Sequence, residues 1–155
     1  MKIKVIVSAV ALCLVASAVS FAATNPHMGT WKLNEAKSKF GKGATKNTTV
    51  VYEAAGDDVK VTVDGTDASG AATHNEWTGK FDGKDYAVSG DPTSDMRSYK
   101  VVSSRTMRLT ARKAGKITLV GTITVSKNGK MRTVITTGKN ASGKRVTNVA
   151  VYDKQ

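Results

Sequence analysis

Residues 106–125 read TMRLTARKAGKITLVGTITV, and this stretch decides the fold class. Apolar side chains recur at every second position over residues 107–111 and again over residues 117–125. Successive side chains of a β-strand point to opposite faces of a sheet, so a period of two predicts two strands that each bury one face. Ala114 and Gly115 form a short turn between them. The stretch therefore predicts an antiparallel hairpin.

The same pattern continues along the chain on both sides of this hairpin. Val59 to Asp64 alternates in the same way, and turn clusters such as Asp82-Gly83 and Asn128-Gly129 separate the apolar runs. Asp-Gly and Asn-Gly supply the positive φ angles that tight hairpins need, which indicates antiparallel pairing of consecutive strands. Ten strands are predicted, at residues 29–33, 47–54, 58–64, 73–81, 84–88, 96–102, 106–113, 116–126, 130–138 and 145–153.

A meander of this many strands leaves two exposed edges unless it closes, and closure into a barrel removes them. A sandwich is the alternative, but the chain has almost no long connections of the kind that Greek-key topology requires. Residues 34–40 are the one segment that reads as helix, with Asn34 as its cap. The remaining chain suits a single domain, residues 23–155.

The first residues have the layout of a secretory signal. Lys2 and Lys4 precede an apolar run from Val5 to Val19, and small residues follow at the expected cleavage point after Ala22. We therefore expect residues 1–22 to be removed and the domain to be periplasmic or secreted. Cleavage would also remove Cys13, the one cysteine, which excludes disulfides and thiol catalysis from the domain.

The chain is strongly basic, with a formal net charge of +12. Such a balance favours anionic partners, among them lipid, polysaccharide and acidic ligands. The cations are spread along nearly every strand and turn, however, and we interpret them as a solvated surface. Aromatic residues are too sparse for the stacking platforms of single-strand binders, so we expect no nucleic-acid partner.

The segment Gly29-Thr30-Trp31-Lys32-Leu33 carries a resemblance to a known superfamily. This segment resembles the first strand of the calycins, the lipocalins and especially the fatty-acid-binding proteins, which carry Gly-x-Trp there. The last residues, 151–155, resemble the end of the last strand in the fatty-acid-binding proteins. Residues 59–70 and 140–154 also resemble small exported lipocalin-like bacterial proteins of unknown function. The resemblance implies an all-β antiparallel meander closed into a single 8- to 10-stranded calycin-like barrel.

The resemblance also implies roles for particular residues. Gly29 and Trp31 would form the structural signature, the indole would close one barrel end, and Lys154 would pack across its ring. Fatty-acid-binding proteins hold a carboxylate with Arg-x-Tyr on the last strand, where this chain has Ala150 and Tyr152. The clamp is broken, so neutral or weakly polar ligands are favoured.

Other arginines do not replace that cation in the predicted alternation. Inward positions are assigned to Met107, Leu109 and Met131. We therefore expect Arg97, Arg108, Arg112 and Arg132 to point outward.

The sequence holds no catalytic or metal-binding constellation. The two histidines, His27 and His74, have no neighbouring pattern of nucleophile and carboxylate, and one histidine without a second ligand makes a poor metal site. We place His74 on the outside of its strand. We expect no enzyme activity, no metal and no cofactor.

Two functions follow, and the sequence leaves both open. In the first, the barrel is an exported binding module for a small apolar or weakly polar ligand, lined by Tyr52, Trp77, Tyr99 and Tyr152. In the second, side chains fill the barrel, and its cationic surface binds an anionic lipid, glycan or protein of the envelope. A monomer is expected in either case.

The leader prediction is tested by the intact mass of protein recovered from the cell envelope. We expect a chain that begins at Ala23 or Thr24. Full-length chain in the cytoplasm, or a lipid adduct on Cys13, would contradict it.

Overall fold

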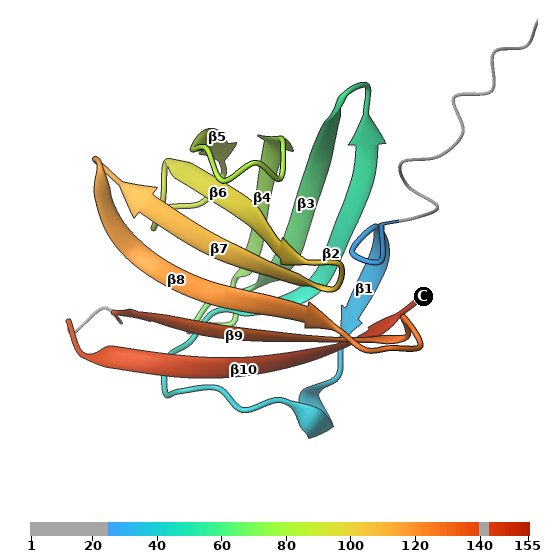
Figure 1. Ribbon diagram of the computed structural model, residues 1–155. Helices are drawn as coiled ribbons and strands as arrows, with labels where there is room; N and C mark the ends of the chain where they lie inside the picture. The colour runs from blue at the N-terminus through green and yellow to red at the C-terminus, as the bar shows by residue number, and fades with distance from the viewer. Residues whose placement is uncertain (1–24, 140–142) are drawn as a thin grey trace, which may run out of the picture.

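The fold is a closed barrel of ten antiparallel strands (Figure 1). The computed structural model describes residues 25–139 and 143–155, so the predicted leader, residues 1–22 with Cys13, lies outside the described residues. The strands are β1 (Gly29–Leu33), β2 (Lys46–Ala55), β3 (Asp58–Thr66), β4 (Ala72–Gly79), β5 (Tyr86–Ser89), β6 (Met96–Ser103), β7 (Thr106–Lys113), β8 (Lys116–Val125), β9 (Met131–Lys139) and β10 (Arg145–Lys154).

Each strand pairs with the next along the chain, and β1 pairs with both β2 and β10. This double pairing closes the sheet and removes both edges. The predicted barrel is therefore confirmed and the sandwich alternative is wrong. The predicted strand bounds agree with the observed ones to within about two residues, since turns with positive-φ glycines such as Gly56, Gly115 and Gly129 set them.

The predicted helix is a single 3₁₀ turn, η1 (Glu35–Lys37). Asn34 caps it, as expected, because its side chain accepts a hydrogen bond from the Lys37 backbone N–H at 3.2 Å. The turn ends at Ser38, and the chain then runs beside β10, where Lys39 pairs with Val149. Among the described residues, no helix is long and apolar enough to cross a membrane.

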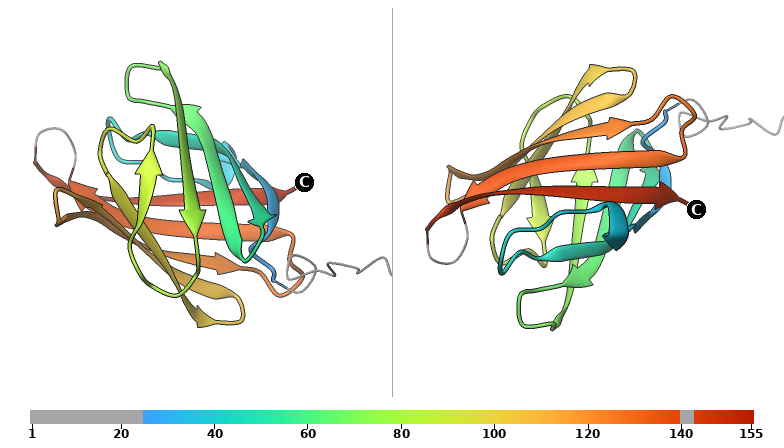
Figure 2. Two further views of the ribbon diagram at one scale, coloured as in Figure 1. Left: turned by 90° about the horizontal axis from the view of Figure 1, so that it is seen from above. Right: turned by 90° about the horizontal axis from the view of Figure 1, so that it is seen from below.

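The hairpin turns divide between two ends of the barrel, which can be followed in Figure 2. One end, called here the closed end, has the residues before β1 and the turns β2–β3, β4–β5, β6–β7 and β8–β9. The other, called the open end, has the β1–β2 connection and the turns β3–β4, β5–β6, β7–β8 and β9–β10.

Trp31 fills the closed end. Its side chain is completely buried, and its indole Nε1 donates a hydrogen bond to the backbone carbonyl of His27 at 2.9 Å. Lys154 Nζ lies 5.2 Å from the centre of the ring, the contact expected from the resemblance. The register accounts for it, because Trp31 and Lys154 are direct partners between β1 and β10.

Gly29 permits this contact in two ways. Its φ of +101° lies in the region that favours glycine. A Cβ there would also lie 3.2 Å from Lys154 Cε, so a side chain would press on the lysine that covers the indole.

Replacement of Trp31 by alanine should lower the free energy of unfolding by about 3–5 kcal/mol. The substitution removes a buried aromatic ring, and the closed barrel cannot contract to fill the cavity that is left. Denaturant midpoints measure the loss. A midpoint that barely moves would show that the indole does not hold this end together.

Candidate ligand-binding site in the barrel

The four predicted ligand-lining residues all point into the barrel. Tyr52, Trp77, Tyr99 and Tyr152 are each at most 3% exposed. They come from β2, β4, β6 and β10, where the inward alternation that the sequence predicts is present. The structure thus brings together side chains that lie up to 100 residues apart in the chain.

Three of the four pack against one another. The Trp77 and Tyr99 rings meet edge to face with centroids 4.8 Å apart, and the Tyr52 and Tyr99 centroids are 6.2 Å apart. Phe81 stacks beside Trp77 at 6.3 Å. Aromatic pairs at such distances stabilise a core beyond their buried area. In this state the rings therefore form packed core near the closed end.

Tyr152 joins the cluster through Arg132, a residue that the sequence reading placed outside. Arg132 is 1% exposed, and its guanidinium lies 4.7 to 5.1 Å from the ring centres of Trp31, Tyr52 and Tyr152. Its Nε and Nη1 have no hydrogen-bond partner in the described structure. The three rings supply the compensating attraction, since a desolvated cation over an aromatic face gains about 2 kcal/mol.

The predicted orientation of Arg132 is wrong because the even-numbered residues of β9 face inward, which is opposite to the predicted alternation. The β9 sequence, MRTVITTGK, has apolar residues at both parities. The β10 register decides the matter, since Arg132 lies opposite the inward Tyr152. Met131 consequently lies opposite Asp153 rather than inside the core.

The predicted orientation of Arg97 is also wrong. It is 8% exposed, and its two terminal nitrogens donate hydrogen bonds to Asn75 Oδ1 at 3.1 Å and Asp91 Oδ2 at 3.0 Å. Although burial opposes it, hydrogen bonds from Ser94 and Thr93 hold the pKa of Asp91 below its usual range. Arg97 is thus neutralised within the fold, whereas Arg112 pairs with Asp85 at the surface.

The inward side chains of β8 and β9 become less buried from the closed end toward the open end. On β8, Val125 and Ile123 near the closed end are 1% and 2% exposed, whereas Leu119 toward the open end is half-buried. On β9, Arg132 is followed by the half-buried inward residue Val134. Gly121 and Gly138 lie at inward positions of the same wall and add no side chain. Thr136 lies at the inward position between Val134 and Gly138. This half of the barrel therefore has a mostly apolar inner wall with little side-chain volume.

Two hollows lie outside the aromatic cluster. One, of about 700 Å³, lies at the rim of the open end between the β1–β2 connection and the β3–β4 hairpin, beside Phe40 and Lys46. The other, of about 280 Å³, lies on the outer surface of β8 and β9. Neither is lined by any of the four predicted ligand residues.

His74 lies on the outside of the barrel, as predicted. Its Nδ1 is 2.6 Å from Asp64 Oδ1, and its Nε2 is 3.7 Å from Glu76 Oε1. The hydrogen bond with Asp64 is the main cause that raises the pKa of His74. Within the described residues, no group of three or more acidic, histidine or cysteine side chains is placed to hold a metal ion.

His27 has the opposite environment. It is 2% exposed, and neither ring nitrogen has a hydrogen-bond partner among the described residues. Burial, assisted by Arg132 and Lys154, lowers the pKa of His27 to about 4. Burial likewise raises the pKa of Tyr152 to about 12, so the closed end holds a neutral imidazole and a neutral phenol at pH 7.

Acid should therefore destabilise the closed end through His27. The folded state resists its protonation, so stability is lost as pH falls from 6.5 toward 4, by about 2 kcal/mol at pH 4.5. Urea denaturation at pH 7 and pH 4.5 measures this loss in the free energy of unfolding. The loss should be smaller in His27→Gln than in the original protein, because glutamine does not titrate. NMR titration should give one histidine pKa near 4 and one above 6.5, and two ordinary values would contradict this account.

Comparison with known proteins shows the fold alone. The chain is similar to a solved structure of EF1p2_mFAP2b bound to DFHBI, at 12% identity over 84% of this chain and 94% of that chain, with a TM-score of 0.51. A redesigned beta barrel, mFAP1, bound to DFHBI, is 14% identical over 85% of this chain and 98% of that chain, with a TM-score of 0.48. No protein-family model and no curated protein matches the chain.

Proposed function

We propose that the protein is an exported binding module that takes a small apolar or weakly polar ligand into the open half of its barrel. The gradient along β8 carries this proposal. Its inward side chains change from completely buried at Ile123 to half-buried at Leu119. An apolar wall that stays partly exposed within a concave fold is the usual property of a small-molecule site.

The aromatic cluster forms the floor of such a site. Tyr99 and Trp77 are buried against each other, and the half-buried Leu109 and Val134 pack against the same core on the side of the open end. A ligand that rests on this floor would contact apolar groups from β7, β8 and β9. The barrel of EF1p2_mFAP2b, which shares the fold, is bound to the small molecule DFHBI. This supports the proposal to the extent that a barrel of this architecture can bind a small molecule.

The charges inside the barrel favour a neutral ligand. Arg97 is paired with Asp91, and three aromatic rings surround the guanidinium of Arg132. A ligand carboxylate would reach either cation only by displacing those contacts. Its own desolvation would cost several kcal/mol without such a partner.

A second candidate is the filled barrel, in which the interior has no ligand and the surface carries the function. The packed rings of Tyr52, Trp77 and Tyr99 and the position of both hollows outside this cluster favour it. The two candidates differ in whether added volume at Leu119 changes binding.

Calorimetric titration with a medium-chain alcohol and the matching carboxylic acid tests the first candidate. We expect the alcohol to bind more tightly than the acid. Leu119→Trp should weaken binding of the alcohol at least tenfold, since the larger side chain occupies the open half. Val120→Trp, on the outer side of the same strand, is the matched control and should leave the affinity unchanged.

Absence of binding, or equal effects of the two tryptophan substitutions, would favour the filled barrel instead. Preference for the acid would show that Arg97 or Arg132 gives up its present contacts to meet the carboxylate.

A further inference from the structure

The charges of the chain are divided between its two parts. Residues 96–152 contain thirteen lysines and arginines and no aspartate or glutamate. The twelve acidic residues all lie before residue 96, apart from Asp153. The interpretation of the cations as an evenly solvated surface therefore does not hold for residues 96–152, whose sequence has no carboxylate among the cations.

Most cations of this half face solvent. Arg97 and Arg112 pair with Asp91 and Asp85, and Arg132 is buried. The other ten cations are exposed: Lys100, Arg105, Arg108, Lys113, Lys116, Lys127, Lys130, Lys139, Lys144 and Arg145. An outer surface with so many cations of one sign attracts an anionic partner.

The exposed apolar side chains lie on the same half. The large hydrophobic residues that the described structure exposes are Val101, Val102, Ile117, Val120 and Ile135, and all belong to β6 to β9. Ile135 is 45% exposed and Val120 is 38% exposed. A surface that combines cations with exposed apolar groups fits a partner that is both anionic and amphiphilic.

The two kinds of side chain are ordered on the β7–β9 outer face. This face comprises the outward residues Thr106, Arg108, Thr110, Val120, Thr122, Thr124, Thr133, Ile135 and Thr137, which alternate with the inward residues of the same strands. Its middle is uncharged apart from Arg108. The outer hollow of about 280 Å³ lies here and extends from the Thr122–Ile135 pair to Ser126 and Met131.

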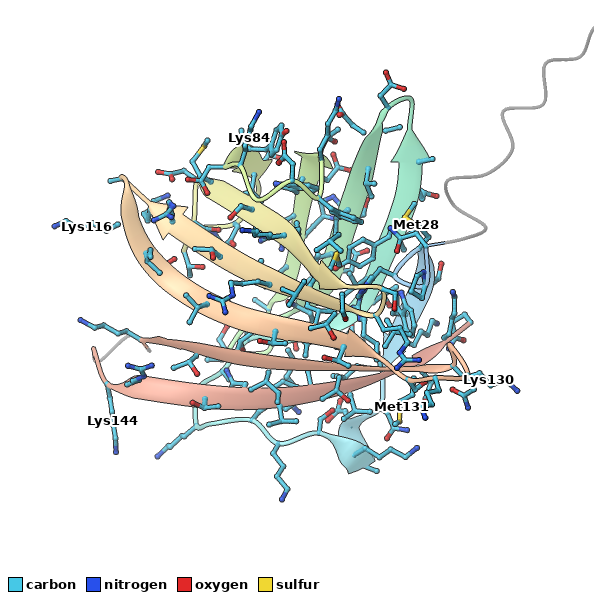
Figure 3. All side chains as sticks on the ribbon, viewed as in Figure 1. Met28, Lys84, Lys116, Lys130, Met131 and Lys144 are labelled. Atoms are coloured by element: carbon cyan, nitrogen blue, oxygen red, sulfur yellow. The ribbon has the colours of Figure 1, made fainter. Side chains whose placement is uncertain are left out.

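Cations flank the uncharged middle at both ends of the strands. Lys116 and Lys139 lie at the open end, and Lys127 and Lys130 lie at the closed end. Figure 3 shows Lys116 and Lys130 at opposite ends of this part of the barrel. Because ten strand residues extend roughly 33 Å, the two cationic groups are separated by an apolar and hydroxyl surface about as long as a strand.

We propose that the β7–β9 outer face docks on a bilayer surface that contains anionic lipid. The lysines at the two ends meet headgroup phosphates, and Val120 and Ile135 contact the boundary between headgroups and acyl chains. A soluble polyanion would use the lysines but not the apolar middle, and this distinguishes lipid from nucleic acid or an acidic glycan. The proposal goes beyond ligand binding and does not depend on it.

Sedimentation with vesicles of phosphatidylglycerol and phosphatidylcholine tests this surface. The protein used begins at Ala23, because the apolar run of the leader would itself bind lipid and the described barrel closes without it. We expect binding to vesicles with phosphatidylglycerol, none to phosphatidylcholine alone, and weaker binding at high salt. Lys116→Ala combined with Lys130→Ala should weaken binding at least tenfold, since each cation near such a surface contributes about fivefold.

Two controls separate this face from net charge and from folding. Lys80→Ala with Lys84→Ala changes the net charge equally on exposed lysines of the other half and should leave binding within twofold. Ile135→Asn should weaken binding to vesicles at least fivefold but leave binding to dextran sulfate within about twofold, with an unchanged circular dichroism spectrum.

Three results would overturn the proposal. One is an absence of binding to anionic vesicles, and another is an equal loss in both double-lysine variants. The third is full vesicle binding by a folded Ile135→Asn protein, which would make the face a site for polyanions only.

Discussion

The rest of the barrel depends on the contact of Lys154 and Arg132 with the indole of Trp31. The ammonium group of Lys154, from β10, lies 5.2 Å from the centre of the indole ring, and the guanidinium of Arg132, from β9, lies 5.0 Å from it. Because Trp31 belongs to the short strand β1, these two cation–ring contacts hold the first strand against the last two. They therefore coincide with the closure of the sheet, and the burial of His27 and Arg132 follows from them.

Closure at one end has a consequence for the other. The aromatic residues near the closed end are used for packing, with Tyr99 in contact with both Tyr52 and Trp77. The inner wall toward the open end is left with small or half-buried groups, such as Gly121 and Leu119. The proposed ligand site and the structural plug are thus two halves of one interior, divided by where bulky side chains fall along the strands.

The outer surface has a comparable division. All acidic residues except Asp153 precede β6 in the sequence. Some pair within their own half, as Glu76 does with Lys60 at 2.7 Å, and others reach β6 and β7, as Asp91 does with Arg97 and Asp85 with Arg112. On β6 to β10 the exposed cations lack carboxylates of their own segment. If the open half binds a small ligand and the β7–β9 outer face binds an anionic bilayer, the proposed ligand site lies close to a membrane, which contains apolar molecules.

The sequence by itself determined the strands, their hairpin order and the inward positions of Tyr52, Trp77, Tyr99 and Tyr152, because alternation and turn residues are local signals. It also placed Trp31 and Lys154 together through their resemblance to a known first and last strand. Only the tertiary structure decided the phase of β9 and the burial of Arg97 and Arg132. Those outcomes depend on cross-strand register and on partners far away in the chain, such as Tyr152 for Arg132. A local sequence pattern therefore does not predict them.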